Sequence, residues 1–133
     1  MFDVENHLHG KYPIQTLEEY LDVCVDFEVG AYIETKNSTD FNNWLFQIGK
    51  NTTYEEILKT TIQSHQFFGL KLPLYFQSFE MDSVARLKEM DFYGSALYTF
   101  LIRSTNVHEI SGFMKKFKAI GLDGLGFAKT AYH

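Results

Sequence analysis

Short apolar runs alternate with amphipathic segments along the chain. The runs lie at residues 31–35, 74–77, 96–100 and 122–127. Near-continuous apolar runs of this length are typical of parallel strands that are covered on both faces. The segments between them repeat apolar residues at helical spacing. This alternation predicts an α/β fold of about four parallel strands joined by helical crossovers.

Two capping boxes predict where helices begin in the first half of the chain. Thr16 and Glu19 form the first box, and Thr53 and Glu56 form the second. In each box the threonine hydroxyl caps the helix, and the glutamate reaches back to the threonine backbone. The second helix is predicted to continue to about Phe68. A glycine follows each segment and is a typical helix stop.

Three further segments have less regular patterns. The asparagine-rich stretch 37–51 is predicted to be a polar loop, with one short helical turn at 41–46 as an alternative. Asp82 is predicted to cap a short helix, and Asn106 to cap another that ends at Gly121. The sequence contains no low-complexity segment or linker, so we expect one compact unit.

Composition narrows the class of protein. The 133 residues suffice for one ordinary domain but not for a complete α/β barrel of roughly 250 residues. With 45% hydrophobic and 22% charged residues the chain is expected to be globular. Its net charge of -5 argues against a nucleic-acid partner. Cys24 is the single cysteine, which excludes an internal disulfide, and its valine neighbours predict a buried thiol.

The sequence gives no indication of the compartment in which the protein works. No apolar run approaches the length of a transmembrane helix. The first residues have neither the basic region nor the apolar segment of a signal peptide, so none is predicted.

The first apolar run ends in a charged strand tip. Tyr32, Glu34 and Lys36 alternate along the strand and therefore point to the same face. The carboxyl ends of parallel strands are where ligands bind in α/β folds. A carboxylate there suits a hard cation, and an ammonium group suits a phosphate. From the spacing alone, this strand tip is therefore either a metal and phosphate corner or a plain surface ion pair.

The second and last runs end in other candidate groups. Gln77 and Ser78 are expected either to hydrogen-bond a substrate or to lead into the cap of the next helix. Gly124 and Gly126 lack the third glycine of a dinucleotide-binding motif. We therefore expect the last strand to serve close packing, or the approach of a ligand to the backbone, and not nucleotide binding.

The histidines do not form a recognisable catalytic pattern. His7 and His9 have the spacing of a metal pair, but they lie in a polar segment with no other ligand nearby. His65 and His108 are predicted to lie inside helices and to face solvent. No histidine is therefore assigned a catalytic role.

Taken in order, four segments resemble the glycerophosphodiester phosphodiesterase family. They are residues 13–21, residues 32–36, Gln77-Ser78-Phe79 and, more weakly, residues 121–126. The family shows a Pro-Thr-Leu-Glu helix start, then a Glu-any-Lys strand and a Gln-Ser-Phe strand, with similar gaps. The resemblance covers nearly the whole chain.

The resemblance implies a TIM barrel with a divalent metal, Ca²⁺ or Mg²⁺, at the carboxyl ends of the strands. It implies hydrolysis of a glycerophosphodiester or lysophospholipid-type substrate to glycerol 3-phosphate and an alcohol. Glu34 would be a metal ligand, Lys36 would lie near the substrate phosphate, and Gln77 would lie at the edge of the substrate site.

The sequence also departs from the family. The His-Arg-Gly motif, the Glu-any-Asp metal pair and the second catalytic histidine do not occur, and the last strand is missing. Residues 1–133 are therefore expected to form a single partial domain, roughly the fourth to seventh strands of the barrel. No set of catalytic residues is complete, so the chain alone should hold the metal weakly and be weakly active or inactive.

Two other interpretations remain open. One is a non-catalytic half-barrel that associates with itself or with a partner through open strand edges. The other is an unrelated small α/β phosphate-binding domain, with Lys36 and the glycine-rich end as its site.

Overall fold

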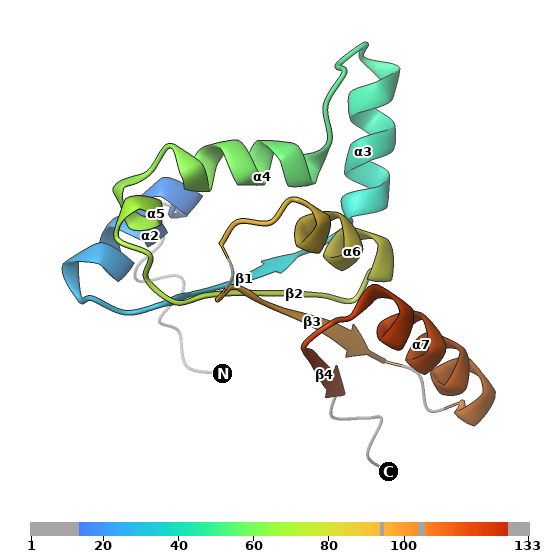
Figure 1. The fold of residues 1–133 in the computed structure, drawn as a ribbon. Helices are drawn as coiled ribbons and strands as arrows, with labels where there is room; N and C mark the ends of the chain where they lie inside the picture. The colour runs from blue at the N-terminus through green and yellow to red at the C-terminus, as the bar shows by residue number, and fades with distance from the viewer. Residues whose placement is uncertain (1–13, 94, 104–105, 128–133) are drawn as a thin grey trace, which may run out of the picture.

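Four parallel strands form a single sheet in the computed structural model, which describes residues 14–93, 95–103 and 106–127 (Figure 1). The strands are β1 (Ala31–Thr35), β2 (Leu74–Ser78), β3 (Leu97–Ile102) and β4 (Gly124–Phe127). All four lie at the predicted apolar runs. However, β3 ends two residues later than expected and β4 begins two residues later.

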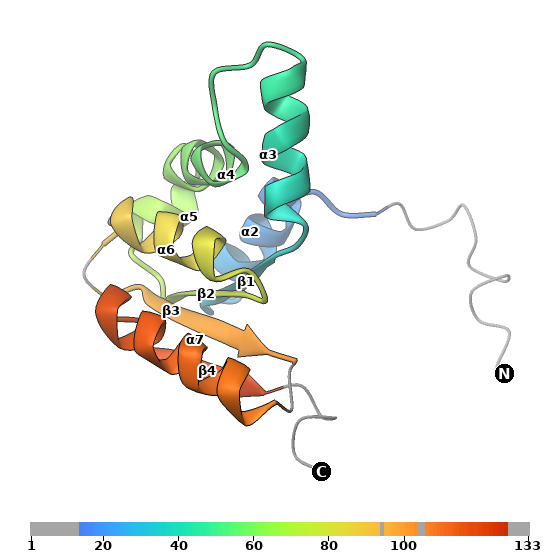
Figure 2. The ribbon, with the colours of Figure 1, turned by 90° about the vertical axis from the view of Figure 1, so that its right-hand side faces the viewer.

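Each strand pairs in parallel with the next strand along the chain. Right-handed crossovers between successive neighbours place all connecting helices on the same face of a sheet. Figures 1 and 2 show α4, α5 and α6 on one side. A doubly wound sheet would reverse its strand order and carry helices on both faces. The prediction of an α/β fold with parallel strands is confirmed, and the arrangement is compatible with part of a TIM-like barrel.

The described helices begin and end largely where local signals place them. They are α2 (Leu17–Asp26), α3 (Ser38–Gln47), α4 (Tyr54–Gln63), α5 (Gln66–Gly69), α6 (Met81–Glu89) and α7 (Val107–Ile120). Both predicted capping boxes are present, at Thr16 and Thr53. Asn106 caps α7, and Gly121 ends that helix in the left-handed conformation at φ 76°. None of these helices has the length and apolarity needed to cross a bilayer.

Most of the asparagine-rich segment is a helix and not the predicted loop, and this helix is longer than the short turn at 41–46 that was the alternative. It forms α3, whose far end extends away from the sheet (Figures 1 and 2). Asn42 explains the error, because its side chain bonds to α4 and does not compete for the backbone of its own helix. Its Oδ1 accepts from the Tyr54 backbone N–H at 2.6 Å, and its Nδ2 donates to Glu55 at 3.1 Å. The local sequence cannot show such a partner.

The single helix predicted to run from Thr53 to about Phe68 is interrupted. Here α4 ends at Gln63, and His65 caps the short helix α5. The His65 Nδ1 atom accepts from the Phe67 backbone N–H at 2.9 Å. Phe67 is fully buried, so the break turns this aromatic side chain into the core.

Asp82 does not cap α6 as predicted. It lies in the first turn, and the N-cap position belongs to Glu80, whose side chain makes no capping bond. The Glu80 carboxylate instead accepts from the backbone and hydroxyl of Thr39. A carboxylate in the first turn is still favourable there because of the helix dipole.

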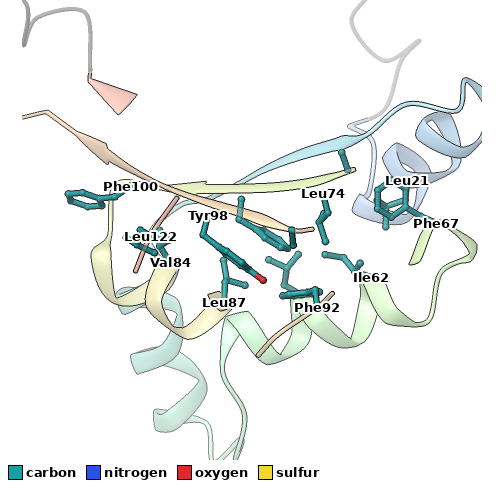
Figure 3. Close-up of a cluster of buried hydrophobic side chains, with 14 of the residues drawn as sticks. Leu21, Ile62, Phe67, Leu74, Val84, Leu87, Phe92, Tyr98, Phe100 and Leu122 are labelled. Carbon is teal, nitrogen blue, oxygen red and sulfur yellow. The ribbon is translucent and has the colours of Figure 1, made fainter. Parts of the chain in front are cut away.

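The hydrophobic core lies between the sheet and the helices (Figure 3). Its labelled members come from every layer: Leu21, Ile62, Phe67, Leu74, Val84, Leu87, Phe92, Tyr98, Phe100 and Leu122. Complete burial of one such leucine or phenylalanine stabilises the fold by about 1.5–3 kcal/mol. Cys24 is 2% exposed, as its valine neighbours predicted.

The opposite face of the sheet carries no helix in the described part of the chain. Tyr32 is 53% exposed and Leu97 is 41% exposed there. A row of paired positions crosses the same face from Glu34 to Gln77, Thr99 and Gly124. In a closed barrel this face would look inward.

Glycines in β4 allow side chains of β3 to lie over its backbone. A Cβ atom on Gly124 would lie 2.9 Å from Thr99 Oγ1, and one on Gly126 would lie 2.6 Å from Leu101 Cδ2. These distances are too short for ordinary side-chain contacts. Close packing therefore accounts for the glycine-rich strand, which was one of the two expected explanations.

Candidate functional site

The carboxyl ends of β1, β2 and β3 meet at one edge of the sheet and border a cleft of about 370 Å³. Each strand contributes residues from the segment that follows it. The lining residues are Thr35, Lys36, Asn37, Phe79, Glu80 and Arg103. Parallel pairing thus gathers three distant segments at the kind of edge where α/β folds bind ligands.

The structure brings the three predicted site residues together. Glu34 is paired with Gln77 in the β1–β2 register, and Gln77 Nε2 donates to Glu34 Oε2 at 3.4 Å. Lys36 Nζ lies 4.0 Å from Glu34 Oε1, and the lysine side chain is 72% exposed. Both interactions are long, and an exposed ion pair of this kind contributes roughly 0–1 kcal/mol. These side chains are therefore not firmly held by one another.

Ser78 has a structural role and does not face the cleft. It is fully buried; its Oγ donates to the Thr35 carbonyl at 3.1 Å and accepts from the Glu80 backbone N–H at 3.0 Å. Thr35 Oγ1 in turn lies 2.8 Å from Ser83 Oγ in α6. Of the two roles expected for Ser78, the structure supports the one in which it begins the next helical segment. These bonds fix the ends of β1 and β2 beneath the site.

A second set of polar side chains lies close to the start of α3. This Glu55 cluster consists of Glu55, Ser38, Asn42 and Arg86. Glu55 is fully buried and accepts from Ser38, from Asn42 at 3.1 Å and from Arg86 at 3.4 Å. Burial acts to raise the pKa of Glu55, but hydrogen bonds from Ser38, Asn42 and Ser83 outweigh it and hold the pKa below its usual value. The cluster joins α3, α4 and α6 and so supports the segment that follows Lys36.

Sequence reasoning missed Arg103 and Glu55. Arg103 was detectable, because it follows an apolar run just as Lys36 does, but the third strand was expected to end before it. Glu55 carried no usable signal. It is one of two acidic residues in the first turn of α4, and only the tertiary structure shows which of them is buried.

The described histidines do not line the cleft. His65 was expected to be solvent-facing within a helix, but its side chain is 12% exposed and its Nε2 lies 2.7 Å from Asp22 Oδ1. His108 is exposed in the first turn of α7. His7 and His9, the possible metal pair, lie outside the described residues.

The described residues do not by themselves fit a resident Ca²⁺ or Mg²⁺ ion. No group of three or more histidine, cysteine, aspartate or glutamate side chains in the described ranges is placed to hold a metal. Glu34 supplies one carboxylate and Gln77 one amide oxygen, whereas these ions take about six or more oxygen ligands. Further ligands would have to come from elsewhere.

The fold and the cleft define an α/β protein with a polar site at its strand tips. The chain is similar to the glycerophosphodiester phosphodiesterase GDPD6 of Arabidopsis thaliana, with 28% identity over 95 residues. The match covers 65% of this chain and 25% of the plant protein, so the chain spans about a quarter of the relative. No protein-family model and no solved structure matches the chain. The similarity suggests the family that the motifs resemble.

Proposed function

We propose that this chain forms part of a barrel of the glycerophosphodiester phosphodiesterase family and supplies one side of its phosphate site. One observation carries the proposal: Glu34, Gln77 and Lys36, the residues that the resemblance singles out, converge at neighbouring strand tips, and Lys36 among them lines the cleft. The similarity to a plant protein of that name supports it. Residues 1–133 would then correspond roughly to the fourth to seventh barrel strands.

The chemistry of the cleft suits a phosphodiester. The ammonium group of Lys36 is exposed and loosely paired, so it can turn to a non-bridging phosphate oxygen and balance its charge. Gln77 donates one long hydrogen bond to the Glu34 carboxylate from the neighbouring strand tip, which leaves that carboxylate available to a further partner. In the complete domain Glu34 would be one of several metal ligands.

A binding experiment tests the phosphate site directly. Glycerol 3-phosphate added to the isotope-labelled chain should shift the backbone amide signals of Lys36, Asn37 and Glu80. Lys36→Met should weaken this binding about tenfold, because one charge-assisted hydrogen bond is lost. Lys115→Met on α7 is the matched control and should leave the affinity unchanged, since Lys115 is exposed and does not line the cleft. Equal affinities in both variants would contradict the proposal.

An activity measurement tests whether the chain is competent alone. We expect little glycerol 3-phosphate to be released from a glycerophosphodiester in the presence of Ca²⁺ or Mg²⁺. Missing acid–base groups alone lower a rate by about 10²–10⁴. Rapid turnover that disappears in Glu34→Ala would show that the chain needs no further catalytic groups.

The uncovered face of the sheet favours a second candidate function, a non-catalytic half-barrel that associates with itself or a partner. Tyr32 and Leu97 are exposed on that face, and β1 and β4 each have one unpaired edge among the described strands. Size-exclusion chromatography should then show a dimer or larger species. A monomer with a sharp unfolding transition would count against this candidate.

A further inference from the structure

Arg103 lies on the aromatic ring of Phe79 at the cleft. The guanidinium carbon is 3.9 Å from the ring centroid, well within the distance for a cation–π interaction. Arg103 follows β3 and Phe79 follows β2, so neighbouring strand tips bring the pair together. Both residues line the same cleft as Lys36.

The charges around the cleft favour an anion. Lys36 and Arg103 are cationic, and Glu80 is the one carboxylate among the described lining residues, which leaves a formal charge of +1. Glu80 Oε2 is turned to Thr39, from which it accepts two hydrogen bonds at 2.9 and 2.6 Å. The ion pairs found within the described part of the chain do not include Arg103. The lining of the cleft thus carries a positive charge in a chain of net charge -5, and the charge of Arg103 contributes most to it, because Glu34 lies 4.0 Å from Lys36 Nζ and partly neutralises the lysine.

The position of Arg103 also opposes binding of a cationic headgroup. Quaternary ammonium groups are recognised by open faces of aromatic rings. Phe79 is the aromatic residue that lines the cleft, and one face of its ring is covered by the guanidinium. A choline-type group would lose that ring face and would also meet a second positive charge beside Lys36.

We propose that Arg103 is a specificity-determining residue that makes the cleft select phosphate esters with an anionic headgroup and reject those with a quaternary ammonium group. Lys36 contacts the ester phosphate, and Arg103 contacts the second anionic group while Phe79 holds its guanidinium plane in place. This inference rests on the proposed function, because it assigns the headgroup preference of that same site.

Three small phosphates test the preference by binding to the full 133-residue chain. They are 3-phosphoglycerate, which carries a carboxylate, glycerol 3-phosphate, which is neutral beyond its phosphate, and phosphocholine, which carries a quaternary ammonium. Affinities measured from the shifts of backbone amide signals should be highest for 3-phosphoglycerate and lowest for phosphocholine. We expect roughly a tenfold difference between these extremes, because one favourable charge contact is replaced by a repulsive one.

Arg103→Met should remove most of this difference. 3-Phosphoglycerate should bind about tenfold more weakly, and phosphocholine should bind several-fold more tightly because the Phe79 face becomes open. The gain for phosphocholine should disappear in the double variant Arg103→Met/Phe79→Leu. Arg103→Lys should keep the preference for the anion in part. Lys116→Met on α7 makes the same change in net charge at an exposed position outside the cleft and should change nothing.

The outcomes separate this inference from the proposed function. Unchanged affinity ratios in Arg103→Met, together with weaker binding of all three phosphates in Lys36→Met, would overturn the role of Arg103 and leave the phosphate site intact. Affinity ratios that depend on Arg103, together with affinities that Lys36→Met leaves unchanged, would support the Arg103 subsite and contradict the proposed phosphate position. Absence of binding by all three probes would overturn both.

Discussion

Glu34 and Glu55 are two carboxylates that flank the segment after β1, and their surroundings are opposite. Glu55 is fully buried and bonded to Ser38, Asn42 and Arg86. Glu34 is partly exposed and has one long hydrogen bond from Gln77. A buried carboxylate with a complete set of hydrogen bonds stabilises the fold, whereas an incompletely bonded carboxylate at a strand tip is available to a ligand.

Because of this difference, loss of each of the two carboxylates should affect stability differently. Loss of Glu55 leaves buried donors without an acceptor, and such donors are costly. Loss of Glu34 leaves Gln77 and Lys36 free to bond to water. Stability measurements should therefore separate the two positions even though the residue type is the same.

The largest expected effect comes from Glu55→Ala. It should lower the free energy of unfolding by about 3 kcal/mol, because Ser38 and Asn42 lose their acceptor and Arg86 its ion pair. Urea unfolding followed by circular dichroism measures the change. Glu56→Ala is a neighbouring control on the exposed side of α4 and should cost only about 1 kcal/mol, through the capping box. Similar losses in both variants would contradict the comparison.

The second effect is on the pH dependence of the free energy of unfolding. The pKa of Glu55 is lowered in the folded chain, so the unfolded chain takes up the proton at higher pH. The stability it contributes is fully present above the unfolded pKa of about 4.3 and is lost as pH falls through the folded pKa. In urea unfolding between neutral and acidic pH, the advantage of the wild type over Glu55→Gln should shrink toward acid. A constant difference would show that Glu55 does not titrate in this way.

The third effect concerns His65, whose side chain is more exposed than that of Glu55 and less exposed than that of Glu34. Its Nδ1 accepts from the Phe67 backbone, so its Nε2 carries the hydrogen donated to Asp22. His65→Ala should cost about 1 kcal/mol through loss of the α5 cap. His65→Asn keeps an acceptor for the cap and should recover much of that loss. Equal unfolding free energies for the two variants would mean that the cap contributes little.

The smallest expected effects are at the candidate site. Glu34→Ala and Gln77→Ala should each change the free energy of unfolding by less than about 0.5 kcal/mol, because these side chains are partly exposed and weakly bonded. Thermal unfolding can bound the change. A loss as large as that of Glu55→Ala would place the Glu34 corner among the residues that hold the fold together.

The sequence predicted the parts of the fold that depend on local signals. The apolar runs gave all four described strands, and the hydroxyl and carboxylate of each capping box gave the starts of α2 and α4. It failed at α3 and at the break before α5. In both places a side chain bonds to another segment, Asn42 to the start of α4 and His65 to Asp22 of α2, and local patterns cannot reveal such partners.

The part of the candidate site that depends on local signals was also predictable from the sequence. Strand alternation placed Glu34 and Lys36 on one face, and the motif order paired them with Gln77. Arg103 was missed because the end of β3 was set too early, and its position over Phe79 depends on the pairing of β2 with β3. The sequence also could not show that Gln77 bonds to Glu34 whereas Ser78 bonds to the backbone of Thr35 and Glu80. These contacts depend on the strand register.

By itself, therefore, the sequence determined the alternation of strands and helices and the charged residues at the strand tips, because periodicity and capping act over a few residues. The tertiary structure alone decided which polar side chains are buried and which border the cleft. Parallel pairing brings residues more than forty positions apart into contact, as it does for Glu34 and Gln77. Burial and hydrogen-bond partners are properties of that assembly and not of any one segment.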